Sequence, residues 1–239
     1  MYTPQDPTPE TAIIVGVVTP QSSRWDVRDS GDEPSKSGVI GVLGAALGCP
    51  VGDPRLEELD RELRMGVRVE RPGSKIIDFQ TVSGVMRTAE GGWKGRPDDP
   101  ATIVSPRTYI QDAVFLVALE GPRETLEECA AALQNPRWPI FLGRKACVPS
   151  RPVLLELTDR YDSVERALEK HPWLCRMPGE AAPERLRCVI EKPSGEYLRP
   201  DRLRVNPARM YEQRAVTMTW GDFPGFSPDC EQPSASVGA

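Results

Sequence analysis

The stretch EPSKSGVIGVLGAALGCP, residues 33–50, reads as a helix that is unusually rich in glycine. Glycine in a helix interior lowers stability by roughly 0.5–1 kcal/mol relative to alanine. Ser35 or Ser37 is a suitable N-cap, and Gly48 followed by Pro50 is a typical helix end. Two explanations for the glycines stay open: close packing of the helix in a core, or a bare backbone that lets a phosphate approach.

The patterns on either side of this helix predict an α+β fold. A short β-branched strand comes before the helix, and an amphipathic second helix comes directly after it. The expected elements are strands over 12–18, 66–70, 76–82 and 109–121, helices over 53–65 and 122–136, and a short strand within 139–157. The first 155 residues therefore approximate β-α-β-β-α-β, the ferredoxin-like pattern that RNA-recognition domains also use.

Three parts are expected along the chain. Residues 1–155 form the ferredoxin-like domain, 156–220 a small β-rich C-terminal unit, and 221–239 a tail without fixed structure. Within the first part, residues 84–106 are too rich in Gly, Pro and charge for a core segment. A loop of this length in a compact domain is usually functional or mobile, so we expect the chain to leave the domain there.

Composition and charge limit the classes of function. The formal net charge is −5, but residues 134–151 carry basic side chains and no acid, which allows a basic face on an acidic protein. No apolar run reaches the roughly 18–20 residues of a membrane span, and no basic region precedes the first apolar stretch as in a secretory signal. The cysteines are scattered without a CxxC pair, which predicts reduced thiols, no metal site and a cytoplasmic protein.

Catalytic motifs give little support for an enzyme. The single histidine, His171, stands at the end of an expected helix before a proline, where a structural role is more common. SKSG at 35–38 is not a nucleotide-binding P-loop, because its Lys and Ser come before the glycines and not after them. What remains is a helix start with Lys36, Ser37 and Gly38, which suits either a bound anion or an ordinary helix cap.

A second candidate anion site is the segment GRK at 143–145. Glycine lets the backbone approach a ligand, while Arg144 and Lys145 supply positive charge, and an arginine can also stack on a base. A solvated turn is the alternative reading of this segment. Candidate stacking platforms for nucleic-acid bases, or otherwise packing residues, are Trp25, Trp93 and Trp138.

Five segments, taken together, carry a resemblance to a known family. They are EPSKSGVIGVLGAALG, DFQTVSGV, PRTYIQDAVFLVALEG, PRWPIFLGRKACVPSRPV and RMYEQRAV, in the family's order and spacing across roughly residues 24–219. The chain thereby resembles the CasD family, the Cas-five-type subunits of the type I-E CRISPR Cascade complex. It departs from the family before Arg24, where TPQSS stands in place of the usual Gly-Pro-Leu-Gln-Ser-Trp-Gly segment, so that turn is shortened or altered.

The resemblance implies a ferredoxin-like (RRM-like) domain with a long β-hairpin thumb over about residues 78–111. It also implies a non-catalytic subunit that binds the 5′ handle of the crRNA, caps the Cascade backbone, and docks the CasC backbone subunit and the CasA large subunit. Target DNA is then recognised indirectly, through pairing with the guide RNA. The implied RNA-binding residues are Arg24, Arg28, Lys36, Ser37, Gly38, Gln80, Thr81, Arg87, Lys94, Arg107, Tyr109, Arg144 and Lys145.

Two other functions stay open beside this one. Some Cas-five relatives cut CRISPR repeat RNA without a metal, and Tyr109 and Lys145 are the residues that such an endoribonuclease would use here. A protein that only scaffolds its partners would show no salt-dependent RNA affinity. The resemblance to type I-E favours the RNA-binding subunit, because a separate subunit, CasE, is the nuclease of that system. It implies neither a cofactor nor a metal.

Overall fold

A computed structural model describes residues 11–18, 31–88, 90–174, 183–205 and 210–222 of the chain. The predicted RNA contacts at Arg24 and Arg28, and residues 223–239 of the expected tail, lie outside these ranges. The described residues form β1 (Thr11–Val18), α1 (Lys36–Leu47), α2 (Pro54–Glu62), β2 (Arg64–Arg71), β3 (Ser74–Gly84), β4 (Met86–Arg87), β5 (Trp93–Lys94), β6 (Ala101–Gln111), β7 (Val114–Pro122), α3 (Arg123–Gln134), β8 (Leu154–Thr158), α4 (Val164–Lys170), β9 (Arg185–Glu191), β10 (Tyr197–Arg204) and β11 (Met210–Asp222).

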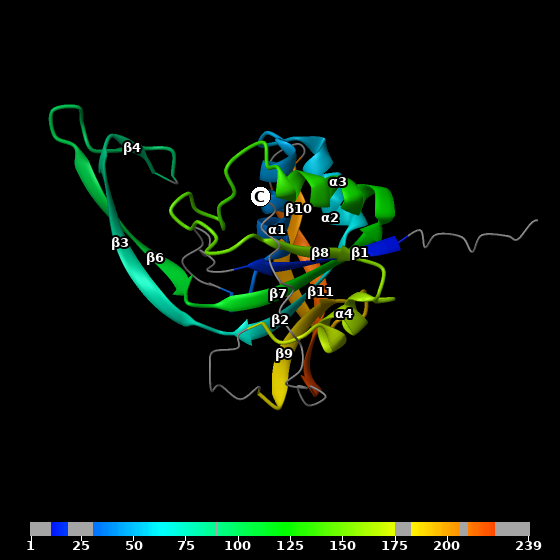
Figure 1. Cartoon of the computed structure of the whole chain (residues 1–239). Coiled ribbons are helices and arrows are strands. Elements are labelled where there is room, and N and C mark those ends of the chain that lie inside the picture. The colour runs from blue at the N-terminus through cyan, green and yellow to red at the C-terminus, as the bar shows by residue number, and fades with distance from the viewer. Residues whose placement is uncertain (1–10, 19–30, 89, 175–182, 206–209, 223–239) are drawn as a thin grey trace, which may run out of the picture.

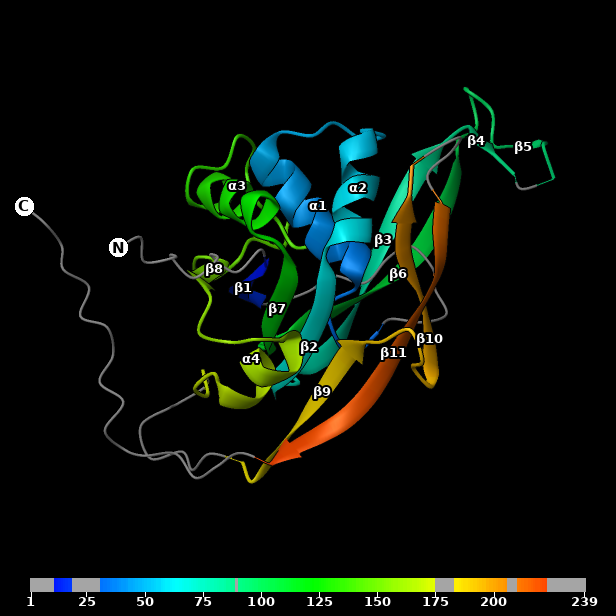
Figure 2. The ribbon, with the colours of Figure 1, turned by 90° about the vertical axis from the view of Figure 1, so that its right-hand side faces the viewer.

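Seven of these strands form one large antiparallel sheet in the order β10-β11-β9-β2-β7-β1-β8. Helices α1, α2 and α3 gather on one face of the sheet, and α4 packs on the other face against β2 and β7 (Figure 2). The chain therefore has a mixed α/β fold, as the order of its sequence patterns indicates.

The central strand β7 explains why residues 114–119 are apolar without interruption. Phe115, Val117 and Leu119 belong to the core under α1, α2 and α3, while Leu116 and Ala118 belong to the core under α4. Successive side chains of a strand point to opposite faces, so a strand covered on both faces needs apolar residues at every position. This burial places β7 in the middle of the domain.

The expected single strand over 109–121 is two strands, β6 and β7, because the backbone turns between them. Asp112 has a φ of 57° there. Between β2 and β3, Gly73 has a φ of 67°, and a Cβ at this position would come within 2.3 Å of the Gln111 carbonyl oxygen. Only glycine fits such a close approach at positive φ without strain. The β2–β7 pair therefore leaves the sheet at these two points and continues as β3–β6.

Strands β3 and β6 form a long curved hairpin that extends away from the sheet (Figure 1). They pair along their full length, from Ser74 opposite Gln111 to Gly84 opposite Ala101, and the short β4–β5 pair lies at the tip. The hairpin occupies the range expected for a thumb and starts at Ser74, before the expected residue 78. The strand expected over 76–82 consequently belongs to this hairpin and not to the main sheet.

The C-terminal strands β9, β10 and β11 extend the main sheet beyond β2. Strand β9 pairs with β2 from Gly66 opposite Ile190 to Arg68 opposite Cys188, and β11 pairs with β9. The strands of the expected small C-terminal unit thus share one sheet with the N-terminal elements. This continuity places β10 beside α1 and α2, and both β10 and β11 contribute residues to the candidate site.

Helix α1 shows why part of its glycine content is needed for packing. Ser35 caps the helix by accepting a hydrogen bond from the Gly38 backbone N–H, and Gly48 ends it with a φ of 78°, as predicted. A Cβ on Gly44 would come within 2.4 Å of Leu56 Cδ2, so this glycine lets α1 and α2 approach each other. By contrast, nothing lies within 4 Å of the position of a Cβ on Gly41.

The lone histidine has the structural position that the sequence predicts. His171 is the C-cap of α4, is buried, and its Nδ1 lies 3.0 Å from the Pro172 carbonyl oxygen. Burial lowers the pKa of its imidazole below the ordinary value of 6.5. The buried Arg68 guanidinium donates to the His171 carbonyl over 2.8 Å, which satisfies a group at the end of the helix.

Candidate functional site

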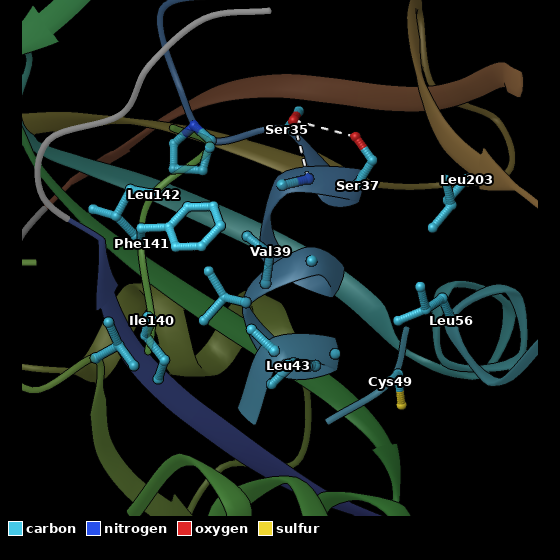
Figure 3. A pocket seen from close by; sticks show the side chains of 18 of the residues that line it. Ser35, Ser37, Val39, Leu43, Cys49, Leu56, Ile140, Phe141, Leu142 and Leu203 are labelled. Carbon is cyan, nitrogen blue, oxygen red and sulfur yellow. Dashed lines mark hydrogen bonds between the residues drawn. The ribbon is translucent and has the colours of Figure 1, made fainter. Parts of the chain in front are cut away.

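A cavity of about 1270 Å³ runs along α1, and its lining combines apolar walls with cationic side chains. Figure 3 shows Ile140, Phe141 and Leu142 on one side of the helix and Leu56 and Leu203 on the other. The first turn of α1 lies between them. The cavity is therefore built from α1, from the segment between α3 and β8, and from the C-terminal strands.

The cationic part of the lining comes from segments that are distant in sequence. Arg107 belongs to β6 of the hairpin, whereas Arg144 and Lys145 belong to the segment between α3 and β8. Gly143 enters this turn with a φ of 82°, and the Leu142 N–H donates to the Cys147 carbonyl over 2.7 Å. The turn is thus held by its own backbone, and it presents two consecutive cations beside the hairpin.

A cation–π contact joins this turn to the base of the hairpin. The guanidinium carbon of Arg144 lies 4.4 Å from the centre of the Tyr109 ring. Gln80 Nε2 donates to the Tyr109 hydroxyl over 3.3 Å and to Asp78 Oδ2 over 2.8 Å. Three of the predicted residues, Gln80, Tyr109 and Arg144, are therefore neighbours in space.

The pairing of the hairpin strands adds Arg107 to the same face. Asp78 lies opposite Arg107, and Gln80 lies opposite Ser105, whose hydroxyl is 3.4 Å from Arg107 Nε. Residues two apart on a strand share a face, so Arg107 and Tyr109 point to the same side of the hairpin. Lys145 is exposed at the edge of the cavity. We call Gln80, Arg107, Tyr109, Arg144 and Lys145 the hairpin-base cluster.

The other predicted hairpin residues lie apart from this cluster. Thr81 follows Gln80 directly and lies opposite Val104, so it belongs to the opposite face of the hairpin. Arg87 and Lys94 are exposed at the tip, where the Arg87 guanidinium carbon lies 5.6 Å from the centre of the Trp93 ring. The tip is far from α1 in both views (Figures 1 and 2).

The outer face of the hairpin carries an apolar surface that the sequence reading did not single out. Ile77, Phe79 and Val104 are 59 %, 69 % and 56 % exposed. They alternate with the residues of the hairpin-base cluster and so share the face of Thr81. The signal was present in the alternation of IIDFQTV and ATIVSP, but a strand with one apolar face reads as a core strand until its position outside the sheet is known.

The prediction that Lys36 contacts phosphate does not hold in this structure. Lys36 is 0 % exposed, and its Nζ donates to both carboxylate oxygens of Glu191, over 3.1 Å and 2.9 Å. Asp60 Oδ2 lies 3.9 Å from the same Nζ. Burial lowers the pKa of Lys36 and raises the pKa of Asp60, while each opposite charge acts against these shifts. The Lys36 ammonium therefore serves an internal ionic network.

The start of α1 does bind an anion, but the chain itself supplies it. The Lys36 backbone N–H donates to Asp201 Oδ2 over 2.9 Å, and the Gly38 N–H donates to Ser35 Oγ over 3.2 Å. Ser37 is buried, with its hydroxyl 3.4 Å from that of Ser35. Of the two readings of this segment, the capped helix agrees with the structure. Ser37 and Gly38 contribute to the cavity wall.

Trp138 and its neighbours extend the apolar wall. Trp138 is partly exposed, lines the cavity, and its backbone N–H donates to the Ala45 carbonyl at the end of α1 over 3.2 Å. Phe141 follows it in the same wall. Phe141 was missed by the sequence reading, because a single aromatic residue between Pro and Gly carries no periodic signal.

Among the residues described, no three His, Cys, Asp or Glu side chains are grouped so that they could hold a metal ion. None of the helices in the described ranges is long and apolar enough to cross a membrane.

Comparison with known proteins places the chain in a family. Residues 21–217 match the model of a family described as CRISPR-associated protein (Cas_Cas5). The chain belongs to this family. The CRISPR system Cascade subunit CasD of Escherichia coli (strain K12) is 30% identical over 157 residues, which cover 61% of this chain and 68% of the relative.

Solved structures agree with this family assignment. A chain of a structure titled "CRISPR RNA-guided surveillance complex" has a TM-score of 0.68 and 31% identity, covering 89% of this chain and 90% of its own length. A structure titled "Crystal structure of Cas protein" has a TM-score of 0.64 and 33% identity, covering 91% of this chain and 100% of its own length. The family resemblance and the mixed α/β fold with its large antiparallel sheet are thereby confirmed.

Proposed function

We propose that this Cas-five family member is a non-catalytic RNA-binding subunit of a CRISPR Cascade complex, and that it holds the 5′ handle of the crRNA at the base of its hairpin. The observation that carries this proposal is the stack of Arg144 on Tyr109, which joins the cations of the loop to those of the hairpin along one cavity. The relationship to the Escherichia coli Cascade subunit CasD supports the assembly context.

The hairpin-base cluster has the groups that single-stranded RNA requires. Arg107, Arg144 and Lys145 supply the positive charge that phosphates need, although the chain has a net charge of −5. Trp138 and Phe141 offer aromatic surface beside them, on which unstacked bases can lie. Cationic and aromatic groups along one cavity are typical of sites that follow an RNA backbone and accept its bases.

The order of strands supports a ferredoxin-like description of the core. Strands β8-β1-β7-β2 are neighbours in the sheet, α1 lies between β1 and β2 in sequence, and α3 lies between β7 and β8. This is the connectivity of a β-α-β-β-α-β unit with α2 added to its first crossover and the hairpin inserted between its middle strands. We therefore propose that residues 11–158 are the RRM-like part of the molecule.

The outer face of the hairpin supports a contact with another protein subunit. Ile77, Phe79 and Val104 form an exposed apolar surface on an arm that extends from the domain, which is a common property of interaction sites (Figure 1). We propose that the CasC backbone subunit contacts this surface. We also propose that the CasA large subunit contacts the domain from which the hairpin extends. Target DNA is then reached indirectly, through guide pairing in the assembled complex.

The alternative of a metal-independent endoribonuclease has weaker support in the geometry. Tyr109 has its ring against Arg144 and its hydroxyl beside Gln80. His171, the only imidazole of the chain, lies at the end of α4 on the other face of the sheet. A general acid–base pair needs a second titratable group within hydrogen-bond reach of the reacting atoms. The contacts of the Tyr109 ring with Arg144 and of its hydroxyl with Gln80 therefore favour a binding role for this residue.

Binding of labelled 5′-handle RNA over a salt series tests the proposal. Arg144→Glu is compared with the matched control Arg160→Glu, because Arg160 also lies over a tyrosine, Tyr161, at 5.7 Å but on the side of β8 and α4. We expect Arg144→Glu to weaken binding and to lower the salt slope by about 1 for each lost phosphate contact, while Arg160→Glu binds as the wild type does.

The same samples, run on a denaturing gel, distinguish binding from cleavage. A scrambled RNA of equal length is the second control. Selective binding of the handle without new fragments supports the proposal, whereas specific fragments formed in the presence of a metal chelator favour the endoribonuclease. Equal effects of the two charge reversals would place the RNA elsewhere on the protein.

A further inference from the structure

The segment RMYEQRAV, which helps to carry the family resemblance, contains a buried arginine whose role is visible only in the structure. Arg214 on β11 is 4 % exposed. Its Nε and Nη2 donate to the two oxygens of Asp201 on β10, each over 2.8 Å. A two-point contact between a guanidinium and a carboxylate fixes direction as well as distance. Asp201 is therefore held in one orientation.

Asp201, held in this orientation, also contacts the start of α1. Its Oδ2, which already accepts from Arg214, also accepts from the Lys36 backbone N–H over 2.9 Å. A carboxylate at this position interacts favourably with the partial positive charge of a helix N-terminus. The first turn of α1 is thus connected to the strand pair β10–β11 by a buried, charged contact.

A second carboxylate binds the other end of the same lysine. Glu191 on β9 accepts from Lys36 Nζ, from Arg202 Nη2 over 3.1 Å, and from the Met65 backbone N–H over 3.2 Å. Buried charges that lose a partner are strongly destabilising, so any displacement of α1 from this set of partners is costly. The position of α1 relative to the C-terminal strands is therefore well determined.

The elements joined by this network also form the wall of the cavity. Ser37 and Gly38 of the first turn of α1 line it, together with Leu203 and Val205 at the end of β10 and Tyr211 on β11. Asp201 and Arg214 themselves are not part of the lining. The network thus supports the wall from positions outside the cavity lining.

We propose that Asp201 and Arg214 are positioning residues for the RNA site. They hold the first turn of α1 in place, so that the cavity wall meets the RNA, and they make no contact with RNA themselves. This inference rests on the proposed function. It assigns the C-terminal strands a part in RNA binding, although their buried charges cannot reach a phosphate.

The variant Arg214→Lys tests the proposal, because it keeps the positive charge and removes the two-point contact. In the free protein we expect faster hydrogen exchange at the amides of residues 36–40 than in the wild type. We expect handle-RNA affinity to fall by about 2- to 30-fold, the range seen for residues that act through a network. The salt slope of binding should not change, since no phosphate contact is lost.

Arg204→Lys is the matched control. Arg204 lies on the same strand pair and joins β10 to Glu57 of α2 and Glu212 of β11, outside the contacts of Asp201. We expect wild-type exchange at α1 and wild-type affinity for this variant. If Arg214→Lys does not fold, Asp201→Asn is measured in its place, since the amide keeps the shape and an oxygen for the Lys36 N–H.

The outcomes separate this inference from the proposed function. Unchanged hydrogen exchange at residues 36–40 in a folded Arg214→Lys protein would overturn the positioning role, whatever the RNA affinity of the variant is. Unchanged RNA affinity together with faster exchange would overturn the link to RNA. A reduced salt slope would mean a direct contact and would also contradict the inference. If the wild type and Arg144→Glu bind RNA equally, the proposed site fails, and that result is independent of Arg214.

Discussion

The guanidinium of Arg144 stacks on the ring of Tyr109, with 4.4 Å between the guanidinium carbon and the ring centre. This contact joins two segments that are separated by α3 and by the whole of β7 in sequence. It fixes the loop between α3 and β8 against the base of the hairpin. The cations that we propose to contact the RNA backbone are therefore held at the base of the hairpin by a contact within the protein.

In the proposed RNA site, the ring of Tyr109 should contribute more to RNA affinity than its hydroxyl does, because the ring contacts Arg144. We predict that Tyr109→Phe keeps most of the handle-RNA affinity, because the ring remains and only the hydrogen bond from Gln80 is lost. Tyr109→Leu should weaken RNA binding by about 0.5–2 kcal/mol, the range of a cation–π contact. Titration of labelled RNA measures both values. Equal losses in the two variants would show that the hydroxyl, and not the stack, matters.

Two glycines are expected to respond in opposite ways to alanine. Gly41→Ala should raise the free energy of unfolding by about 0.5–1 kcal/mol, because nothing lies within 4 Å of the new methyl group and the helix gains in propensity. Gly66→Ala on β2 should lower it by about 1–3 kcal/mol, because a Cβ there would come within 2.2 Å of Val164 Cγ1 and 2.8 Å of Leu168 Cδ1. Urea unfolding measures both.

Gly41→Ala also separates the two explanations of the glycine-rich helix. Gly41 lines the cavity, so a methyl group at this position enters the space that we assign to RNA. We expect this variant to be more stable than the wild type and to bind handle RNA more weakly. Wild-type affinity in the stabilised variant would show that bare backbone at this turn is not needed for the ligand.

Asp60 gives the buried network a defined pH dependence. Burial raises the pKa of this carboxyl above its ordinary value of 3.8. In the window between 3.8 and the raised pKa, the folded protein binds more protons at Asp60 than the unfolded chain does. The contribution of Asp60 to the free energy of unfolding therefore increases as the pH falls through this window.

We thus predict that the unfolding free energy of the wild type minus that of Asp60→Asn increases as the pH is lowered from neutrality toward 3.8. Urea unfolding of both proteins at a series of pH values gives this difference directly. Glu57, whose pKa is lowered by hydrogen bonds from the Val205 N–H and from Arg204, should show the opposite sign in a Glu57→Gln variant. A difference for Asp60→Asn that shrinks on acidification would refute the assigned shift.

The apolar outer face of the hairpin should matter for assembly and not for folding. Phe79 is 69 % exposed, so Phe79→Ser should change the free energy of unfolding by no more than about 0.5 kcal/mol. The same variant should copurify less with a CasC backbone subunit than the wild type does. Val82→Ser, at an exposed apolar position of the same strand but on the opposite face of the hairpin, is the control. Full assembly of the Phe79→Ser protein would rule out this face as the docking surface.

Much of the fold follows from local patterns. The helix at 36–47 begins and ends where Ser35 and Gly48 predict, and His171 caps α4 as expected. The break at Asp112 was not predicted, because the residues on both sides of it continue an apolar run and a positive φ at an aspartate has no strong local signal. The strand over 76–82 lies in the hairpin, which the family resemblance predicts from about residue 78 but the local pattern does not.

The candidate site likewise contains some residues that the sequence predicts and others that it does not. Arg144 and Lys145 are visible in the sequence as cations beside a glycine, and the structure places them on the cavity. The burial of Lys36 could not be foreseen, since its partner Glu191 is 155 residues away along the chain. Arg214 and Asp201 were likewise invisible, because a buried ion pair depends on strand register, which short-range patterns do not specify.

Photo-cross-linking tests the central claim most directly. Handle RNA that carries 4-thiouridine is irradiated with the wild-type protein, and the linked peptides are identified by mass spectrometry. The account predicts cross-links to residues of the hairpin-base cluster and its aromatic wall, at Tyr109, Trp138 and Phe141 above all, and their loss with Arg144→Glu. Cross-links concentrated on α4 and β8, or a pattern unchanged by Arg144→Glu, would contradict the claim that the base of the hairpin holds the RNA.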